Sequence, residues 1–247
     1  MRLASLLLAM GLGLAACGPT PQTSTPSPLG QGHYGARTDT GPNGEPIEIN
    51  AVRTAYLTER NRRQRVPYNG PEAADTIVVD PYARFLYHVL GNGEAMRYGV
   101  AVGQAGKNFQ GSATIGRKHA WPSWTPTANM VRTQPELYRP LRGGLPGGVD
   151  NPLGSRALYL YKGSRDTMYR IHGTMDPSSV GKATSAGCIR LFNQDIMELF
   201  EQIPKGAPVK VRTRAESLAL EGPLVELPNG YLAPAGEVET AAAEPAQ

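Results

Sequence analysis

The chain has 247 residues, of which 40% are hydrophobic and 19% are charged, and it contains 29 glycines and 22 prolines. This composition can supply a packed core, and its many turn-forming residues favour a mainly β fold over a helical bundle. The net charge of +4 is not gathered into a basic stripe with interleaved aromatic residues, and no zinc-finger or helix-turn-helix spacing is present, which argues against a nucleic-acid partner.

The first residues have the pattern of an export signal. Arg2 is followed by a short apolar stretch, Leu3 to Leu14, and this stretch is too short to span a membrane, because a spanning helix needs about 20 apolar residues. The following residues, Leu14-Ala15-Ala16-Cys17, resemble the lipobox of bacterial lipoproteins. We therefore expect residues 1–16 to be a signal peptide and Cys17 to carry a lipid anchor. The alternative is an ordinary signal peptide from which Cys17 is discarded.

A lipidated Cys17 predicts a periplasmic protein held at a membrane. The residue after the cysteine is Gly18 and not an aspartate, which fits sorting to the outer membrane. Residues 17–50 are rich in Pro, Thr, Ser, Gly and Gln and predict a disordered tether. Residues 51–73 form an N-terminal extension, and the arginine-rich part from Ala51 to Arg65 is compatible with a short solvated helix.

From Thr76 onwards the sequence alternates between strand and turn patterns. The Asn92-Gly93 pair predicts a tight turn between two antiparallel strands. Residues 103–155 have little periodicity and predict a long functional loop. The expected strands cover residues 76–80, 85–90, 95–102, 158–161, 169–172 and 209–211.

One helix is expected near the carboxyl end of this β-rich region. Asn193 is a favourable N-cap, Asp195 adds to the cap, and the apolar residues from Ile196 to Ile203 recur at helical spacing. Residues 74–213 are thus expected to form the catalytic domain. Residues 214–247 are expected to form a C-terminal extension with a disordered tail.

Cys188 is the only thiol that remains in the mature chain if Cys17 is lipidated. In an oxidising compartment a lone cysteine is an accident, an intermolecular bridge or a reactive thiolate. His172 ends a predicted strand, and Cys188 lies 188 − 172 = 16 residues later, in a glycine-containing turn. A strand end and a turn before a helix meet at one rim of a sheet, which is the geometry that a Cys–His pair requires.

The chemistry of such a pair assigns a role to each neighbouring residue. An imidazole accepts the thiol proton and later returns it to a leaving amine. The carbonyl of Gly173 is available to orient the ring of His172. Gly187 allows close approach of a substrate, the amides of Gly187 and Cys188 face a developing oxyanion, and Arg190 adds positive charge. Ser185 is either a hydroxyl donor in this region or a turn residue.

The same stretch resembles the signature of the L,D-transpeptidase catalytic domain family, the YkuD type. The matching residues are His172-Gly173-Thr174, Pro177, Ser179, Gly181-Lys182-Ala183, Ser185, Gly187-Cys188-Ile189-Arg190-Leu191, Asn193 and Asp195. The resemblance is strong over residues 170–212 and weaker from 75 to 170. Many members have a histidine at the position of Ala186, so contacts that such a histidine makes with substrate do not carry over.

The resemblance implies an L,D-transpeptidase-like β-sandwich or barrel with a capping helix and a long loop that lines the groove. It also implies that Cys188 forms a thioester with the diamino acid of a peptidoglycan tetrapeptide stem, releases D-alanine and transfers the acyl group to an amine. The implied acceptors are a second stem peptide, a lysine-bearing wall-anchored protein, a D-amino acid or, in a carboxypeptidase, water. No metal and no cofactor are implied. A wall-binding lipoprotein without activity is the remaining alternative.

Overall fold

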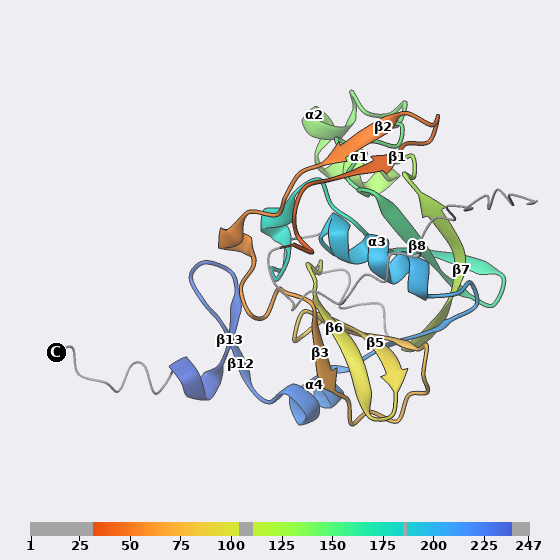
Figure 1. Cartoon of the computed structure of the whole chain (residues 1–247). Helices are drawn as coiled ribbons and strands as arrows, with labels where there is room; N and C mark the ends of the chain where they lie inside the picture. Colours follow the sequence, from red (N-terminus) through yellow and green to blue (C-terminus); the bar gives the residue numbers. More distant parts are fainter. Residues whose placement is uncertain (1–31, 104–110, 185–186, 239–247) are drawn as a thin grey trace, which may run out of the picture.

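The computed structural model describes residues 32–103, 111–184 and 187–238 (Figure 1). Nine strands of these described residues form one mixed sheet. Their order is β10 (Ile189–Arg190), β9 (Arg165–His172), β8 (Arg156–Lys162), β7 (Gly111–Ala120), β11 (Pro208–Val211), β4 (Ile77–Asp80), β5 (Phe85–Gly91), β6 (Glu94–Gly99) and β3 (Gln64–Pro67). The predicted mainly β fold is therefore confirmed.

The large sheet curls until its two ends approach each other. Beyond β6, the backbone amide of Ala101 donates to the carbonyl of Arg190 in β10 at 2.9 Å, and the amide of Arg190 donates to the carbonyl of Ala101 at 3.0 Å. Strand β10 also pairs in parallel with β9, which places Arg190 opposite His172. This short strand therefore joins the two ends of the sheet and brings the cysteine turn to the end of the histidine strand.

Apolar side chains fill the inside of the curled sheet. The helix α3 (Asn193–Gln202) lies beside β8 and β9 and contributes Ile196 and Leu199, both with no exposed surface. Each such side chain stabilises the fold by roughly 1.5–3 kcal/mol through burial. The predicted helix is thus present, and its apolar face is the one that the sequence periodicity indicated.

The turn between β5 and β6 has the conformation that its sequence predicts. Asn92 and Gly93 have φ angles of 53° and 74°, which are the two positive values of a type I′ turn. The strand after the turn is shorter than expected, because β6 ends at Gly99.

Residues 103–155 contain more regular structure than the sequence predicts. Strand β7 covers residues 111–120, and two short helices follow, α1 (Ala128–Thr133) and α2 (Pro135–Tyr138). The strand was missed because its only buried side chains are Ala113 and Ile115. A Cβ added at Gly116 would lie 2.3 Å from the ring of Tyr161. The tyrosine ring therefore packs directly on the glycine backbone, and the sequence shows no alternation of apolar residues at this point.

The expectation of a disordered tether across residues 17–50 is wrong for its second half. Strands β1 (Arg37–Thr40) and β2 (Pro46–Ile49) form an antiparallel hairpin. The hairpin is held by Asp39, which accepts hydrogen bonds from Trp121 Nε1 at 2.8 Å and Arg156 Nη1 at 2.6 Å. These partners are more than 80 residues away in the sequence, so local composition could not reveal them. Residues 17–31 lie outside the described residues, as does Cys17.

The short helix with which residues 51–65 are compatible is not formed. This segment contains a single 3₁₀ turn, η1 (Thr54–Tyr56), and then enters the edge strand β3. Its arginines make separate contacts instead, such as the stacking of Arg60 over the Phe85 ring at 4.3 Å.

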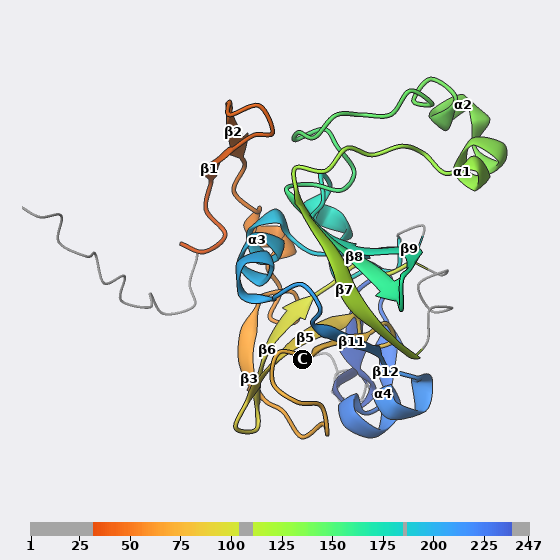
Figure 2. The same ribbon diagram turned by 90° about the vertical axis from the view of Figure 1, so that its right-hand side faces the viewer.

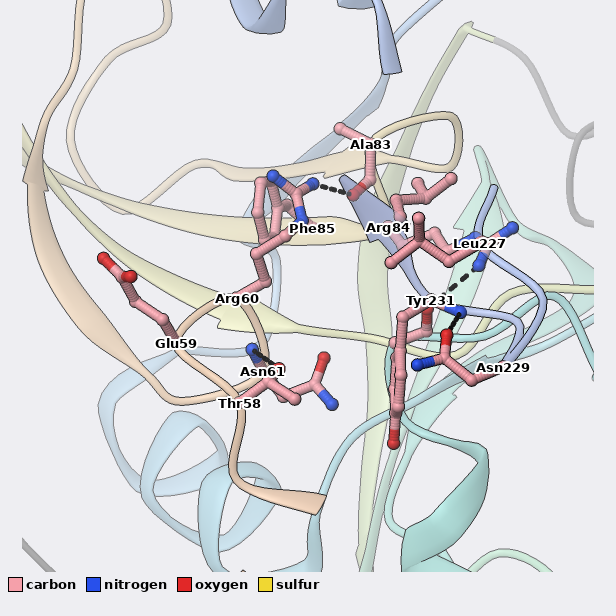
Figure 3. Close-up of a pocket in the computed structure, with 12 residues that line it drawn as sticks. Thr58, Glu59, Arg60, Asn61, Ala83, Arg84, Phe85, Leu227, Asn229 and Tyr231 are labelled. Carbon is pink, nitrogen blue, oxygen red and sulfur yellow. Dashed lines mark hydrogen bonds between the residues drawn. The ribbon is translucent and has the colours of Figure 1, made fainter. Parts of the chain in front are cut away.

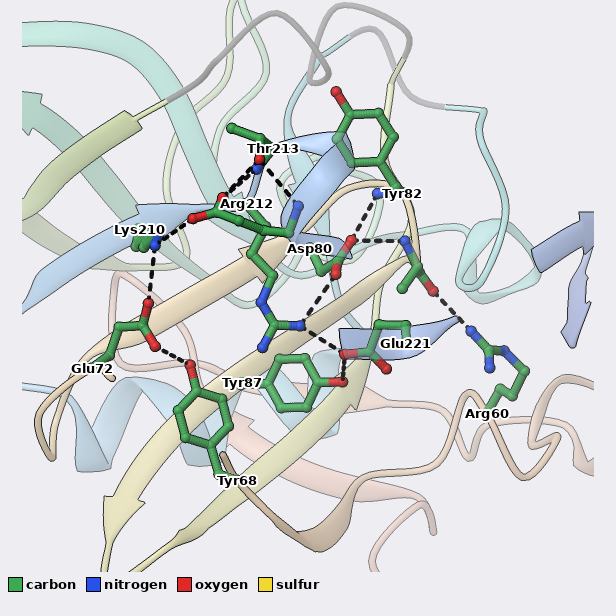
Figure 4. A network of polar contacts seen from close by, with 12 residues as sticks. Arg60, Tyr68, Glu72, Asp80, Tyr82, Tyr87, Lys210, Arg212, Thr213 and Glu221 are labelled. Carbon is green, nitrogen blue, oxygen red and sulfur yellow. Dashed lines mark hydrogen bonds and ion pairs between the residues drawn. The ribbon is translucent and has the colours of Figure 1, made fainter. Parts of the chain in front are cut away.

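The C-terminal extension begins with the helix α4 (Arg214–Glu221), which Thr213 and Glu216 cap reciprocally. It is joined to the sheet by buried charges (Figure 4): Arg212 contacts Asp80 at 3.2 Å and Glu221 at 2.7 Å. Asp80 has no exposed surface, and its charge helps to raise the pKa of Arg212. The chain then forms a second hairpin from β12 (Leu224–Glu226) and β13 (Leu232–Pro234). Within the described ranges, no helix has the length and apolar character needed to cross a membrane.

Candidate active site

His172 is the last residue of β9, and its side chain is 3% exposed. Its Nδ1 lies 2.6 Å from the carbonyl oxygen of Gly173. Because a carbonyl can only accept a hydrogen bond, Nδ1 carries the proton and Nε2 remains as the basic nitrogen. The structure thus brings together two of the predicted residues, and the contact between them fixes the tautomer that a general base needs.

The Gly173 peptide is itself held from two sides. Its amide donates to the carbonyl of Arg156 at 3.0 Å. On the other side, the side chain of Asn193 accepts from the amide of Ser155 at 2.9 Å and donates to the carbonyl of Thr174 at 2.9 Å. A Cβ at Gly173 would lie 2.2 Å from Asn193 Oδ1. Only glycine therefore allows Asn193 to fasten the turn that follows the histidine.

This arrangement corrects the predicted roles of Asn193 and Asp195. The N-cap of α3 is Phe192 and makes no side-chain capping bond, while Asn193 is the first helical residue. Asp195 is fully buried and lies 3.1 Å from His33 Nε2 and 3.4 Å from the Tyr34 hydroxyl. Both side chains are therefore used for tertiary contacts. Their type and spacing match a cap equally well, and only the contacts distinguish the two.

Cys188 directly precedes β10 and is partly exposed. The parallel register pairs Ile189 with Ile171 and Arg190 with His172, so the thiol lies at the beginning of the short strand that borders the histidine. The backbone of Arg170 forms a hydrogen bond to this thiol. Gly187 is buried with φ at 146°, a conformation that side chains with a Cβ rarely adopt. Ser185 lies outside the described residues.

The charges around the site favour a neutral imidazole. Burial, and then the positive charge of Arg190, lower the pKa of His172 to about 3, although hydrogen bonds with the backbone of Gly173 and Leu153 oppose the shift. Burial raises the pKa of the Cys188 thiol, while the Arg170 backbone and the charges of Arg170 and Arg190 oppose that rise. At neutral pH the resting pair is therefore a thiol and an unprotonated imidazole.

The C-terminal hairpin contacts the segment that leads to Cys188. The Arg84 guanidinium donates to the carbonyls of Gly181 at 3.0 Å and Gly230 at 2.6 Å, and it pairs with Glu226. Lys182 Nζ lies 4.9 Å from the ring centroid of Tyr231. Sequence reasoning missed these contacts because the hairpin and Arg84 lie outside the recognised motif.

A cavity of about 250 Å³ separates this hairpin from the N-terminal extension (Figure 3). Arg84 and Gly181 belong to its lining, whereas Cys188 and His172 do not. The lining residues are Thr58, Glu59, Arg60, Asn61, Ala83, Arg84, Phe85, Gly181, Leu227, Asn229, Tyr231 and Leu232.

Comparison with known proteins gives a family match over most of the sheet. A family model described as YkuD, L,D-transpeptidase catalytic domain, matches residues 74–211, which is more than half of the chain. The chain is 37% identical over 129 residues to the probable L,D-transpeptidase YbiS of Escherichia coli K12. It is 34% identical over 140 residues to the probable L,D-transpeptidase ErfK/SrfK of Salmonella typhimurium.

These matches cover only part of each protein. They include 51% of this chain and 40% of YbiS, and 56% of this chain and 44% of ErfK/SrfK. A solved structure described as a probable carnitine operon oxidoreductase from Brucella melitensis is 45% identical, with a TM-score of 0.45, and the match covers 60% of this chain and 92% of that chain.

Proposed function

The chain belongs to the YkuD family of L,D-transpeptidase catalytic domains, and from this premise we propose that it acts on peptidoglycan stem peptides through a thioester at Cys188. The observation that carries the proposal is the state of His172. Its Nδ1 faces the Gly173 carbonyl at 2.6 Å, and its pKa is lowered to about 3. A neutral imidazole with an unprotonated Nε2 is the form that accepts a proton from a thiol.

In the proposed first half-reaction, the Cys188 sulfur attacks the carbonyl carbon at the L-centre of the diamino acid in a tetrapeptide stem. The thiol proton passes to His172 Nε2. The bond to the terminal D-alanine then breaks, and the imidazolium returns the proton to the leaving amine. The products are D-alanine and a thioester, and no oxidant or reductant is needed.

In the proposed second half-reaction, the amine of an acceptor attacks the thioester carbonyl. An amide bond forms, the carbon–sulfur bond breaks, and the proton lost by the amine returns to the thiol through the imidazole. The amides of Gly187 and Cys188, with the Ser185 hydroxyl, would stabilise the oxyanion in both half-reactions. The charge of Arg190 would support the same oxyanion or bind a carboxylate of the stem.

The proposed location is the periplasm, with Cys17 lipidated after removal of residues 1–16. The anchor is tested separately from the activity. Membrane-associated mature protein with a diacylated Cys17, and loss of that association in a Cys17→Ala variant, would support this location. A mature protein that lacks Cys17 would contradict it.

To test the activity, the chain from residue 18 onwards is incubated with disaccharide-tetrapeptide, and products are followed by mass spectrometry beside a Cys188→Ala variant. We expect an acyl-enzyme on Cys188, release of D-alanine and a dimer that has lost one D-alanine, all absent in the variant. A tripeptide as the only product, even with added D-amino acid or lysine-ended peptide, would indicate a carboxypeptidase. Absence of both acyl-enzyme and D-alanine would refute the catalytic proposal.

A further inference from the structure

Residues 121–155 form an arm that leaves the sheet at the end of β7 and returns at the start of β8. Figure 2 shows α1 and α2 at the far end of this arm, clear of the sheet. The side chain of Leu137 in α2 is 57% exposed. The outer part of the arm therefore adds little to the core of the domain.

The base of the arm is nevertheless held by hydrogen bonds. The backbones of Trp124 and Leu145 exchange two hydrogen bonds, of 2.9 and 2.7 Å, and so close its base. The Asn151 side chain donates to the carbonyls of Pro122 at 3.0 Å and Pro146 at 2.8 Å. Fixing a backbone in one conformation costs conformational entropy at every residue. Ordered segments that return so little burial to the core commonly serve binding.

Three arginines gather at the far end of the arm. Arg132, Arg139 and Arg142 are all exposed, and together with Ala128 and Val131 they line a groove of about 480 Å³. The carboxylates carried by the arm are Glu136 and Asp150. Within the described parts of the chain, no carboxylate forms an ion pair with any of the three arginines.

The base of the arm adjoins the candidate active site. Ala157, just after the arm returns to the sheet, is the cross-strand partner of His172. The backbone of Leu153, near the end of the arm, lies close enough to the imidazole to oppose the lowering of its pKa. The base of the arm therefore borders the histidine, while the arginine groove lies at its far end.

We propose that this arginine groove binds carboxylates of peptidoglycan stem peptides next to the stem that reacts at Cys188. A guanidinium is planar and matches a carboxylate with two parallel hydrogen bonds. A polymer with many stem peptides presents such carboxylates repeatedly, so three weak contacts act together. The choice of polymer rests on the proposed function, whereas the preference for carboxylates rests on the groove itself.

The test compares wild type with the triple variant Arg132→Gln/Arg139→Gln/Arg142→Gln. A control variant, Arg53→Gln/Lys205→Gln/Arg214→Gln, removes the same charge from exposed residues elsewhere. Binding to intact peptidoglycan sacculi is measured by sedimentation at low and high salt, and again with sacculi whose carboxylates have been amidated. The rate of Cys188 acylation is measured separately with a soluble tetrapeptide donor.

We expect the arm variant to bind native sacculi about tenfold more weakly than wild type, since exposed ion pairs each contribute only a small factor to affinity. The control variant should bind native sacculi like wild type. On amidated sacculi, wild type and the arm variant should bind equally weakly. The affinity of a triple Arg→Lys variant should lie between those of wild type and the arm variant. Lysine keeps the charge but cannot form the two parallel hydrogen bonds of a guanidinium. Acylation by the soluble donor should stay within about twofold.

Equal binding of wild type and arm variant, or equal loss in the control variant, would overturn the proposal. So would an arm-dependent preference for anionic phospholipid vesicles over sacculi. If no variant, including wild type, is acylated by the soluble donor, the proposed function fails while the binding result still decides the role of the groove.

Discussion

The two sides of the candidate site differ in how their surroundings act on ionisation. At His172, burial and the charge of Arg190 both lower the pKa of the imidazole. At Cys188, burial raises the pKa of the thiol, whereas the charges of Arg170 and Arg190 lower it. The same arginines therefore reinforce burial on one side and oppose it on the other. The imidazole is therefore neutral at neutral pH. The pKa of the thiol, in contrast, depends on opposing effects, and replacing a single residue can shift it.

The two sides also differ in how they are held. The turn after His172 is fastened by Asn193, whose side chain bonds two backbone groups in other segments. The segment before Cys188 is contacted at Gly181 by Arg84, which in turn contacts the C-terminal hairpin. Variants on each side therefore test whether the contacts of the histidine turn matter more for the reaction than the contacts of the cysteine segment.

The largest effect is expected from His172→Gln. This change removes the basic Nε2, and general-base catalysis is worth about 10²–10⁴-fold in rate. We expect acylation of Cys188 by the tetrapeptide donor to fall by that amount, with the thermal unfolding midpoint little changed. Single-turnover mass spectrometry measures the acylation rate. An unchanged rate would mean that the thiol ionises without the imidazole.

A smaller loss is expected from Asn193→Ala. The amide of Ser155 and the carbonyl of Thr174 lose their partner, and an unsatisfied buried polar group costs about 1–3 kcal/mol. We expect denaturant titration to show a loss of about 2–4 kcal/mol and the acylation rate to fall more than tenfold.

Asn193→Asp is the matched control, because it keeps the acceptor for the Ser155 amide and loses only the donor to Thr174. It should recover part of the stability. If Asn193→Ala lowers stability but leaves the acylation rate of the folded fraction unchanged, the asparagine has no positioning role toward the histidine turn.

These contacts mark the limit of what the sequence could predict. The strand that ends at His172, the Asn92-Gly93 turn and the helix from residue 193 follow from local patterns, because turn chemistry and apolar periodicity act between neighbours. The Gly173 carbonyl was predicted as the partner of His172 for the same reason, since the two residues are adjacent. The role of Asn193 was not predicted, because its partners Ser155 and Thr174 come from other segments.

The hairpin β1–β2 illustrates the same limit in a second region. Its sequence resembles a tether, and its order depends on Asp39 meeting Trp121 and Arg156. Strand β7 was missed because glycine at position 116 packs against an aromatic ring. In each case the decisive contact joins residues distant in sequence, which composition and periodicity do not report.

The balance at the thiol is tested by Arg190→Gln. Wild-type His172 has a pKa lowered to about 3, so its ring should show no protonation between pH 8 and pH 5 in an NMR titration. Removing the charge of Arg190 should raise the pKa of His172, because a positive neighbour disfavours the imidazolium. It should also raise the pKa of Cys188, because the thiolate loses a favourable charge.

The second shift is measured from the pH dependence of Cys188 alkylation by iodoacetamide, which reports the thiolate. We expect several-fold slower alkylation of Arg190→Gln at pH 8, while Arg190→Lys, which keeps the charge, should react like wild type. Shifts of the two groups in opposite directions would show that Arg190 acts through packing and not through its charge.

The smallest effect is expected where the C-terminal hairpin meets the cysteine segment. Arg84 has φ at 58° and is 6% exposed, and its guanidinium contacts Gly181, Gly230 and Glu226. Lysine in its place keeps one charge but cannot reach all three acceptors. We expect Arg84→Lys to slow acylation of Cys188 by about two- to threefold, because lysine keeps the charge and local relaxation recovers most of the cost of the lost hydrogen bond.

Arg65→Lys supplies the matched control, since Arg65 also pairs with a glutamate, Glu94, at 2.9 Å, but on the exposed edge of the sheet. It should leave acylation unchanged. Measuring kcat and KM separately distinguishes two roles of Arg84. If the contacts of Arg84 position the thiol, Arg84→Lys lowers kcat for the soluble donor. If the hairpin only covers the cavity, the variant changes neither constant. Equal rates for Arg84→Lys and Arg65→Lys would therefore mean that the contacts of Arg84 do not position the thiol.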